Sequence, residues 1–247
     1  MKSRERIDKL LMTRGLADSR TKAQAMVMAG VVLIDEKQVA KPSELFASDA
    51  AIRIKGDSPE KRYASRGGLK LEAALIAFQI DPTGYNCIDI GSSTGGFTDC
   101  LLKHGAALVV AIDVGTNQLI WRLRTDTRVV VRENTNARDL KPKDFETKFD
   151  LAVMDVSFIS VTKILSAVIP LLAPTGKIVV LIKPQFEVGK GEVGKGGIVR
   201  ETEKHERAIA KVNEFAVGLG LIRKGLIESP ILGAEGNKEF LAFYERD

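Results

Sequence analysis

The sequence predicts a doubly wound, mostly parallel α/β sheet that ends in an antiparallel hairpin, preceded by a small α+β domain. From about residue 63, apolar strand-like runs alternate with helical segments, a pattern typical of a parallel sheet covered on both faces. The last two apolar segments, 226–232 and 240–244, have a short connection, which predicts an antiparallel pair. The first 60 residues carry short elements of their own. We therefore expect domains at residues 1–60 and 65–247, joined by a connector at 61–64.

The amino-terminal domain is predicted to contain two short helices and two strands. Apolar residues at helical spacing predict a first helix that ends at Gly15. The second helix can be capped by Asp18 or Ser19 and ends at Gly30. Residues 31–34 and 52–55 are expected to form strands.

The second domain is predicted to alternate strands and helices before its final hairpin. Its strands are expected near residues 86–90, 108–113, 128–132, 150–155 and 177–183. Its helices are expected near residues 70–79, 96–104, 117–124, 158–169 and 202–219. In a sheet of this kind, ligands bind beyond the carboxyl ends of the strands.

Most of the net charge of +5 lies in the first quarter of the chain. Residues 1–64 hold 13 Lys and Arg against 9 Asp and Glu, whereas the remaining residues hold 24 against 23. A basic small domain suggests a polyanionic partner, although charge alone also fits a solvated helix surface. The basic residues that we expect to meet the partner cluster on the two helices: Arg4, Arg6, Lys9, Arg14, Arg20 and Lys22.

Composition argues against several classes of protein. No apolar run approaches the roughly 18 residues of a membrane helix, and the charged start lacks a signal-peptide core, so a cytoplasmic protein is expected. Two cysteines, Cys87 and Cys100, and two histidines provide neither a metal set nor a disulfide framework. We expect both thiols to be buried and inert.

A glycine-rich turn follows the first strand of the second domain. The segment Asp89-Ile-Gly-Ser-Ser-Thr-Gly-Gly-Phe97 reads as strand, turn and helix, and its glycines allow the backbone to approach a ligand closely. Such a turn predicts binding of a nucleotide-like cofactor. The residues expected to contact it are Asp89, Gly91, Ser92, Ser93, Gly95, Gly96 and Phe97, together with Asp155 at the end of a later strand.

Residues after the next two strands narrow the choice of cofactor. Asp113, followed by Val114, can accept hydrogen bonds from ribose hydroxyls, which suits NAD and S-adenosylmethionine equally. The turn departs from the GxGxxG pattern and the sheet ends in a hairpin, and both features favour S-adenosylmethionine. Asn136, beside Ala137, could read an adenine amino group or simply form a turn.

Four ionisable residues are expected to converge on this edge of the sheet: Lys70, Asp155, Lys183 and Glu239. Each alone fits a solvated strand or helix end. Lys183 follows an apolar strand, where partial desolvation favours the neutral amine that can accept a proton. Asp155 and Glu239 would then orient the amine and stabilise the ammonium. For Phe158, packing in the core is the favoured interpretation, with stacking on a substrate as the alternative.

These motifs resemble three known families. Arg6-Ile-Asp-Lys-Leu-Leu11 and Ser19-Arg-Thr-Lys-Ala23 resemble the S4 RNA-binding domain. The set Lys70–Asp155–Lys183–Glu239 looks like the K-D-K-E tetrad of FtsJ/RrmJ-like ribose 2′-O-methyltransferases. Together with Ser65-Arg-Gly-Gly-Leu-Lys70 and Lys183-Pro-Gln-Phe-Glu187, the whole chain resembles the TlyA family, although the family's connector tryptophan is Tyr63 here.

The resemblance implies a Rossmann-like methyltransferase sheet that binds S-adenosylmethionine and methylates a ribose 2′-hydroxyl of ribosomal RNA, without a metal. Lys183 would accept the hydroxyl proton and Lys70 would steady the developing negative charge. The glycines of segment 186–197 themselves predict a mobile loop that closes over RNA, with a plain surface loop as the alternative, and Arg66 and Lys190 are expected to contact RNA. Two alternatives remain: a membrane-active hemolysin, which the lack of a secretion signal and of a long apolar segment opposes, and a non-catalytic RNA-binding factor.

Overall fold

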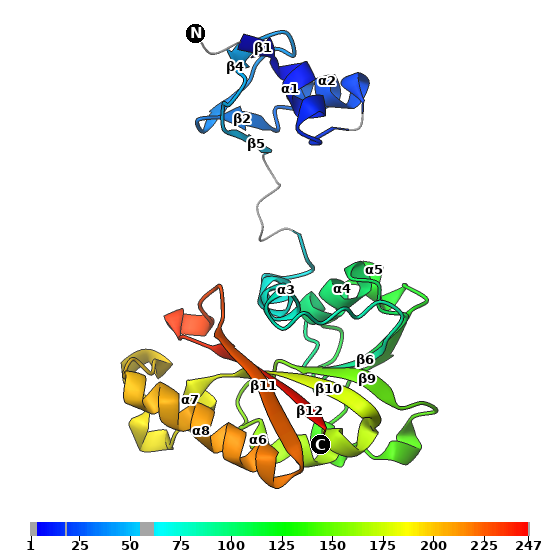
Figure 1. Cartoon of the computed structure of the whole chain (residues 1–247), viewed down its shortest axis with the longest axis vertical. Coiled ribbons are helices and arrows are strands. Elements are labelled where there is room, and N and C mark those ends of the chain that lie inside the picture. The colour runs from blue at the N-terminus through cyan, green and yellow to red at the C-terminus, as the bar shows by residue number, and fades with distance from the viewer. Residues whose placement is uncertain (1–3, 18, 55–61, 247) are drawn as a thin grey trace. The chain divides into compact units, whose positions relative to one another are not determined.

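The computed structural model describes residues 4–17, 19–54 and 62–246, and the chain divides into two compact units, Met1–Arg62 and Tyr63–Asp247 (Figure 1). Lys61, at the start of the expected connector, lies outside the described residues. Tyr63 and Ala64 belong to the second unit, and the side chain of Tyr63 packs in a buried apolar cluster of that unit.

The first unit packs two helices against short antiparallel strands. α1 (Ile7–Thr13) and α2 (Arg20–Met28) are the two helices that the sequence predicts. The strands are β1 (Arg4–Arg6), β2 (Val32–Ile34), β3 (Lys37–Gln38), β4 (Leu45–Ala47) and β5 (Ile52–Ile54). They form a β1–β4 pair and a sheet of order β3-β2-β5. The hydroxyl of Ser19 accepts a hydrogen bond from the Lys22 N–H at 3.2 Å, so Ser19 is the cap of α2; Asp18 is not described.

The predicted clustering of the basic residues on the two helices is wrong for three of them. Arg4 and Arg6 lie in β1, and Arg14 follows the end of α1. A short charged segment carries little strand signal, and the partner of β1 lies about forty positions away, as the pairing of Arg4 with Ala47 shows. The pairing with β4 that makes Arg4–Arg6 a strand therefore cannot be predicted from the local sequence.

The second unit is built on the mixed sheet that the sequence predicts. Its order is β11-β12-β10-β9-β6-β7-β8. Five of its strands run parallel to their neighbours in this group: β6 (Asn86–Ile90), β7 (Leu108–Ile112), β8 (Val129–Arg132), β9 (Phe149–Met154) and β10 (Leu172–Ile182). β12 (Phe240–Arg246) is antiparallel to both of its neighbours, β10 and β11 (Leu221–Glu228).

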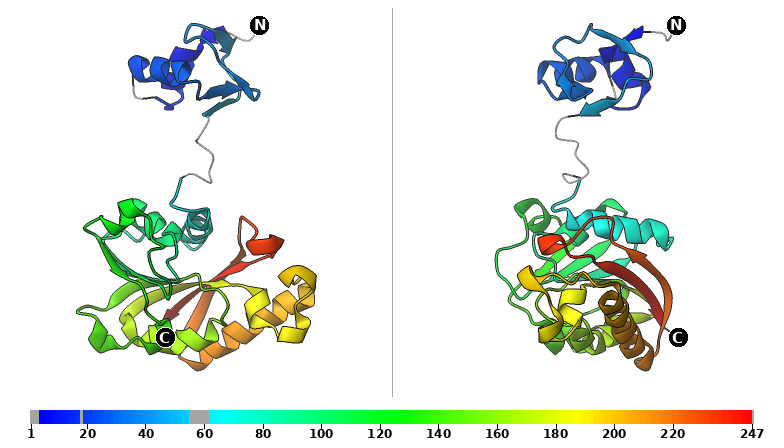
Figure 2. Two further views of the ribbon diagram at one scale, coloured as in Figure 1. Left: turned by 180° about the vertical axis from the view of Figure 1, so that it is seen from behind. Right: turned by 90° about the vertical axis from the view of Figure 1, so that its left-hand side faces the viewer.

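Helices cover both faces of this sheet, as Figures 1 and 2 show. One face carries α3 (Gly67–Ala77), α4 (Gly96–Lys103) and α5 (Trp121–Arg124). The other carries α6 (Thr162–Val168), α7 (Pro184–Glu187) and α8 (Thr202–Gly218). Two separate buried clusters of apolar side chains match the two faces, one including Leu71 and Leu101 and the other Leu165 and Val212. Short 3-10 turns complete the unit: η2 (Ala137–Asp139), η3 (Pro142–Asp144), η4 (Ile169–Leu171), η5 (Lys190–Glu192), η6 (Lys195–Gly197) and η7 (Ala234–Gly236).

Several predicted elements have other bounds in the structure; β10, for example, begins at Leu172 and not near residue 177. α5 begins only at Trp121 because Asn117 has φ +54° and Glu133 accepts the N–H groups of residues 117–119. α6 begins at Thr162 because Phe158 has φ +66°, which no helix accommodates. β11 begins at Leu221, where polar residues on an edge strand hide the strand pattern.

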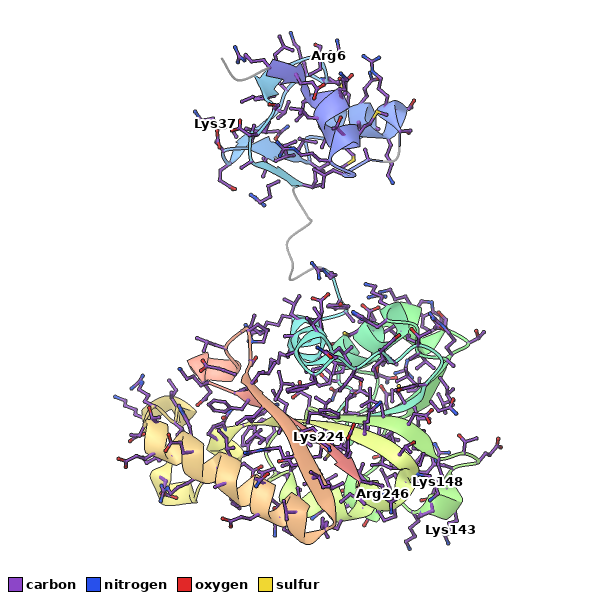
Figure 3. All side chains as sticks on the ribbon, viewed as in Figure 1. Arg6, Lys37, Lys143, Lys148, Lys224 and Arg246 are labelled. Carbon is purple, nitrogen blue, oxygen red and sulfur yellow. The ribbon has the colours of Figure 1, made fainter. Side chains whose placement is uncertain are left out.

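The predicted site residues lie at only one of the two edges that the strand ends form. The carboxyl ends of β6, β7, β9 and β10, together with the start of β12, form one edge, and the segments that follow or precede them hold the predicted site residues. Figure 3 shows Lys143, Lys148 and Arg246 at the opposite edge. Any site built from strand ends therefore lies at the first edge.

Candidate active site

The glycine turn between β6 and α4 packs tightly on the end of β9. Gly91 has φ +84°, and a Cβ atom there would lie 2.4 Å from the backbone oxygen of Asp155. A Cβ atom on Gly96 would lie 2.4 Å from the Ser65 Oγ, and one on Gly95 would meet Leu123. Gly95 and Gly96 thus serve packing within the protein as well as the shape of the turn.

Two adjoining cavities open at this turn. The smaller, about 260 Å³, is lined by residues that include Ser65, Arg66, Lys70, Phe97 and Asp155. The larger, about 460 Å³, is lined by residues that include Asp113, Val114, Asn136, Ala137 and Phe158. Gly91, Ser93 and Asp155 line both. Of the predicted cofactor-binding residues, all but Asp89 and Gly95 line one cavity or the other.

Asp89 is a fully buried carboxylate beneath the turn. Its Oδ2 accepts a hydrogen bond from the Thr98 hydroxyl at 2.6 Å, whereas its Oδ1 has no partner among the described residues. Burial raises the pKa of Asp89 to about 7, and the Thr98 hydrogen bond opposes that shift. An unpaired buried carboxylate oxygen is costly, and because Asp89 lines neither cavity, its contact with Thr98 supports the turn from within the protein.

Asp113 joins the glycine turn to the loop after β7. Its Oδ2 accepts the Ser93 N–H at 2.8 Å, and its Oδ1 accepts the Gly115 N–H at 2.7 Å. Each carboxylate oxygen can accept a further hydrogen bond, so Asp113 can hold both loops and a ligand hydroxyl. The Oδ1 of Asn136 accepts from the backbone N–H of Arg138 at 3.1 Å; Asn136 therefore forms the turn that the sequence suggested, at the wall of the larger cavity.

The four predicted ionisable residues form two close ion pairs. The Nζ of Lys183 lies 2.6 Å from the Asp155 Oδ1, and the Nζ of Lys70 lies 2.5 Å from the Glu239 Oε2. Only 10% of the Lys183 side chain and 9% of the Lys70 side chain are exposed. Lys70 and Asp155 both line the smaller cavity. Because buried ion pairs add little stability over apolar packing, two of them at one edge point to function.

The segments on either side of β10 hold Lys183 and the loop after β9 in place. Pro184 opens α7 directly after Lys183, and the Lys183 Nζ donates to the Ser157 Oγ at 2.8 Å. The buried carboxylate of Glu187 accepts the Ser160 hydroxyl at 2.5 Å and the Val161 N–H at 2.8 Å. Burial raises the pKa of Glu187. Sequence reasoning missed the roles of Ser157 and Glu187, which depend on contacts between separate segments.

Phe158 lies on the surface, so the favoured prediction of core packing is wrong. Its side chain is 91% exposed, and its φ of +66° is rare for an aromatic residue. Its ring centroid lies 5.4 Å from that of Phe186, whose ring lies 5.9 Å from the Lys183 Nζ. An exposed aromatic ring therefore lies near Lys183.

The glycine-rich segment is anchored at several points. Glu192 accepts from Arg207, and its backbone oxygen accepts from the Lys204 Nζ at 2.9 Å. The Nδ2 of Asn237 donates to the Gly197 oxygen at 2.9 Å. The side chain of Lys190 lies outside what the structure describes. Arg66 is exposed and lines the smaller cavity.

The remaining basic residues of the first unit have mixed surroundings. Arg14 donates to the backbone oxygens of Ser48 and Ala50, so it also holds the loop after β4. Lys9 pairs with Glu5 at 2.7 Å, and Arg4 donates to the Leu45 oxygen at 3.2 Å. Lys22 is exposed in α2.

Both cysteines are free and buried, as predicted. Burial raises the pKa of the Cys100 thiol to about 12, and it raises the pKa of Cys87 as well. A thiol that stays protonated is a poor nucleophile and a poor metal ligand. In the described ranges, no group of three or more His, Cys, Asp or Glu side chains could hold a metal ion.

The chain matches two family models. Residues 63–246 match the FtsJ-like methyltransferase, and residues 5–49 match the S4 domain. The curated relatives include the 16S/23S rRNA (cytidine-2'-O)-methyltransferase TlyA of Mycobacterium tuberculosis, which is 46% identical over 97% of this chain and 89% of its own length. They also include Hemolysin A of Brachyspira hyodysenteriae, 41% identical over 97% of this chain and 99% of its own length.

Solved structures resemble the chain as well. A structure named as a hemolysin from Streptococcus thermophilus has a TM-score of 0.74 and 46% identity, and the match covers 100% of this chain and 90% of that one. A magnesium protoporphyrin IX methyltransferase from Synechocystis, 11% identical with a TM-score of 0.51 over 74% of this chain and 79% of its own, shares the fold of the second unit.

Proposed function

The chain belongs to the FtsJ-like methyltransferase family, and from this premise we propose that it methylates a ribose 2′-hydroxyl of ribosomal RNA, with S-adenosylmethionine as methyl donor. The names of the TlyA relatives support the substrate. The observation that carries the proposal is the presence of two lysine–carboxylate pairs at the cavities, Lys70–Glu239 with Lys70 in the lining of the smaller one and Lys183–Asp155 with Asp155 in the lining of both.

The larger cavity and the glycine turn have the chemistry that the donor requires. Asp113 accepts hydrogen bonds from the ribose hydroxyls, and Asn136 and Ala137 adjoin the adenine. The turn from Asp89 to Phe97 holds the methionine part through the residues that line the cavities, among them Gly91 and Ser93. When bound, S-adenosylmethionine supplies a methyl group on a positively charged sulfur that leaves readily.

The two ion pairs, of which Lys70 and Asp155 line the smaller cavity, act on the hydroxyl of the substrate. Once the amine of Lys183 has released a proton to solvent, it accepts the hydroxyl proton of the substrate, and Asp155, 2.6 Å away, stabilises the ammonium that forms again. The Ser157 hydroxyl fixes the Lys183 amine in direction. Lys70, held by Glu239, stabilises negative charge that develops on the attacking oxygen. Alignment of the two reactants by these groups accounts for much of the rate enhancement.

The substrate is held by basic and aromatic side chains. The S4 domain contributes phosphate contacts from Arg4, Arg6, Lys9, Arg14, Arg20 and Lys22, and the second unit contributes Arg66 and Lys190. The exposed ring of Phe158 stacks on the target nucleotide. Structured RNA is recognised mainly through shape and backbone, which suits a domain whose charge lies on its surface.

The test is transfer of labelled methyl groups to purified ribosomal subunits. The intact protein is expected to label ribose in ribosomal RNA, and Lys183→Ala to lose at least about 100-fold in kcat. Lys163→Ala, an exposed lysine of α6, is the matched control and keeps full activity. Failure of the intact protein to label either subunit would overturn the proposal.

The two alternative functions have separate tests. The hemolysin name of one relative raises membrane activity, but no helix within the described residues is long and apolar enough to span a membrane. Lysis of liposomes by the purified protein would support that alternative. Full function of Lys183→Ala in cells would support a non-catalytic RNA-binding factor.

A further inference from the structure

Asp8 is a buried carboxylate of the first unit that has no part in the methyl-transfer steps proposed above. It lies in the first turn of α1, and its side chain is 0% exposed. Arg6 donates to both of its oxygens, from Nε at 3.0 Å and from Nη2 at 2.8 Å. The Arg20 Nε donates to Oδ2 at 3.2 Å, and the Gln24 Nε2 donates to the same atom at 3.1 Å. One carboxylate therefore joins β1, α1 and α2.

The two arginines reach the surface from this buried centre. The side chains of Arg6 and Arg20 are 41% and 60% exposed. Toward other described residues, the Nη1 atom of Arg6 and both Nη atoms of Arg20 donate no hydrogen bond. Figure 3 shows Arg6 at the junction of β1 and α1. A guanidinium fixed by one edge on a carboxylate presents its remaining N–H groups in a defined direction, which suits a phosphate.

We propose that Asp8 is a positioning residue for RNA binding, which fixes Arg6 and Arg20 in the orientation that contacts backbone phosphates. The inference rests on the proposed function, because it takes RNA as the ligand of these arginines. A long side chain loses rotamer freedom when it is fixed at an interface. Arginines that are already fixed before RNA arrives avoid part of that loss.

Charge and positioning make opposite predictions for this residue. Asp8 subtracts one unit from the positive charge of the unit, and a lower positive charge by itself weakens binding to a polyanion. If only charge matters, removal of the Asp8 charge tightens RNA binding. If Asp8 positions the arginines, the same change weakens binding although net charge rises.

Asp8→Asn in the full chain distinguishes the charge effect from the positioning effect. Glu36→Gln is the matched control, because Glu36 also pairs with an arginine of the same unit, Arg53 at 2.5 Å, but its side chain is 74% exposed and Arg53 is not assigned to RNA. Binding to purified bacterial ribosomal subunits is measured over a range of salt concentrations. Asp8→Asn is expected to weaken binding about 3- to 10-fold and to reduce the salt dependence, while Glu36→Gln leaves binding unchanged or tighter.

Turnover gives a second readout. Asp8→Asn is expected to raise the KM for ribosomal subunits with kcat and the KM for S-adenosylmethionine unchanged, because the second unit is untouched. Arg6→Lys keeps the net charge and a cation beside Asp8 but loses the two-point contact, so it is expected to weaken binding as well. Arg6→Lys therefore tests the idea even if Asp8→Asn unfolds the first unit, which thermal unfolding would reveal.

The possible outcomes test the positioning role of Asp8 separately from the proposed methyl transfer. If Arg6→Ala and Arg20→Ala weaken binding but a folded Asp8→Asn binds as tightly as the unchanged protein, the positioning role is wrong and the proposed function stands. Wild-type affinity of Arg6→Lys would likewise overturn the positioning role. If methyl transfer to ribosomal subunits is itself absent, the proposed function fails.

Discussion

The amine of Lys183 lies between two oxygen acceptors, the Asp155 Oδ1 at 2.6 Å and the Ser157 Oγ at 2.8 Å. Ser157→Ala removes the neutral acceptor and leaves the ion pair intact. We expect kcat to fall about 5- to 10-fold, the cost of one hydrogen bond, with little change in the KM for RNA. Single-turnover methyl transfer measures this. Ser166→Ala, on the exposed side of α6, is the control, and an equal loss there would refute the role of Ser157.

Substitutions in the Lys70–Glu239 pair are expected to affect stability and activity differently. Glu239→Ala leaves a buried ammonium without its partner and is expected to lower the free energy of unfolding by about 3–5 kcal/mol. Replacing both residues, as Lys70→Met with Glu239→Leu, is expected to recover most of that stability but no activity. Urea denaturation and methyl transfer are measured on the same samples. An active double variant would remove Lys70 from the mechanism.

Gly91 and Gly84 form a natural comparison. Both have positive φ, +84° and +77°, but a Cβ atom on Gly84 would have nothing within 4 Å, whereas one on Gly91 would meet the Asp155 oxygen. Alanine at either position costs about 1 kcal/mol in backbone strain. Only Gly91→Ala is expected to lose S-adenosylmethionine binding, because the turn must move away from β9. Isothermal titration of both variants with S-adenosylmethionine measures this. An equal loss of affinity in Gly84→Ala and Gly91→Ala would contradict the packing argument.

Asp89 predicts a pH-dependent stability. Its pKa in the folded protein is raised to about 7, so the folded state holds the proton more tightly than the unfolded state does. The contribution of Asp89 to stability is then greatest below about pH 4 and falls by up to about 1.4 kcal/mol per pH unit until about pH 7. Asp89→Asn removes the titrating group.

The measurement is denaturant unfolding of both proteins between about pH 5 and about pH 8. At the higher pH, Asp89→Asn is expected to gain stability relative to the unchanged protein, because only the latter carries a buried charge there. Parallel stability curves for the two proteins would show that Asp89 does not titrate in this range.

The sequence carried the parts of the fold that depend on local pattern. Apolar runs marked β6, β7, β9 and β10, and the residues that end them, Asp113, Asp155 and Lys183, could be placed at one edge because parallel strands share a direction. The tetrad and the glycine turn were visible for the same reason.

What the sequence could not reveal depends on contacts between distant segments. β1 is charged and is a strand only because Leu45–Ala47 pairs with it. Phe158 resembles a core residue by type, but its positive φ turns it to the surface. Glu187 and Asp8 look like ordinary surface acids until their partners, 26 and 12 positions away, enclose them.

The placement of β12 inside the sheet, between β10 and β11, has a consequence for damaged or incomplete chains. β12 is preceded by Glu239, whose contact with Lys70 spans 169 positions. A chain that ends after β10 but before Glu239 leaves one edge of β10 without a strand partner and Lys70 without its carboxylate. Such fragments expose a strand edge, which favours aggregation, and they lack one of the two ion pairs of the candidate site.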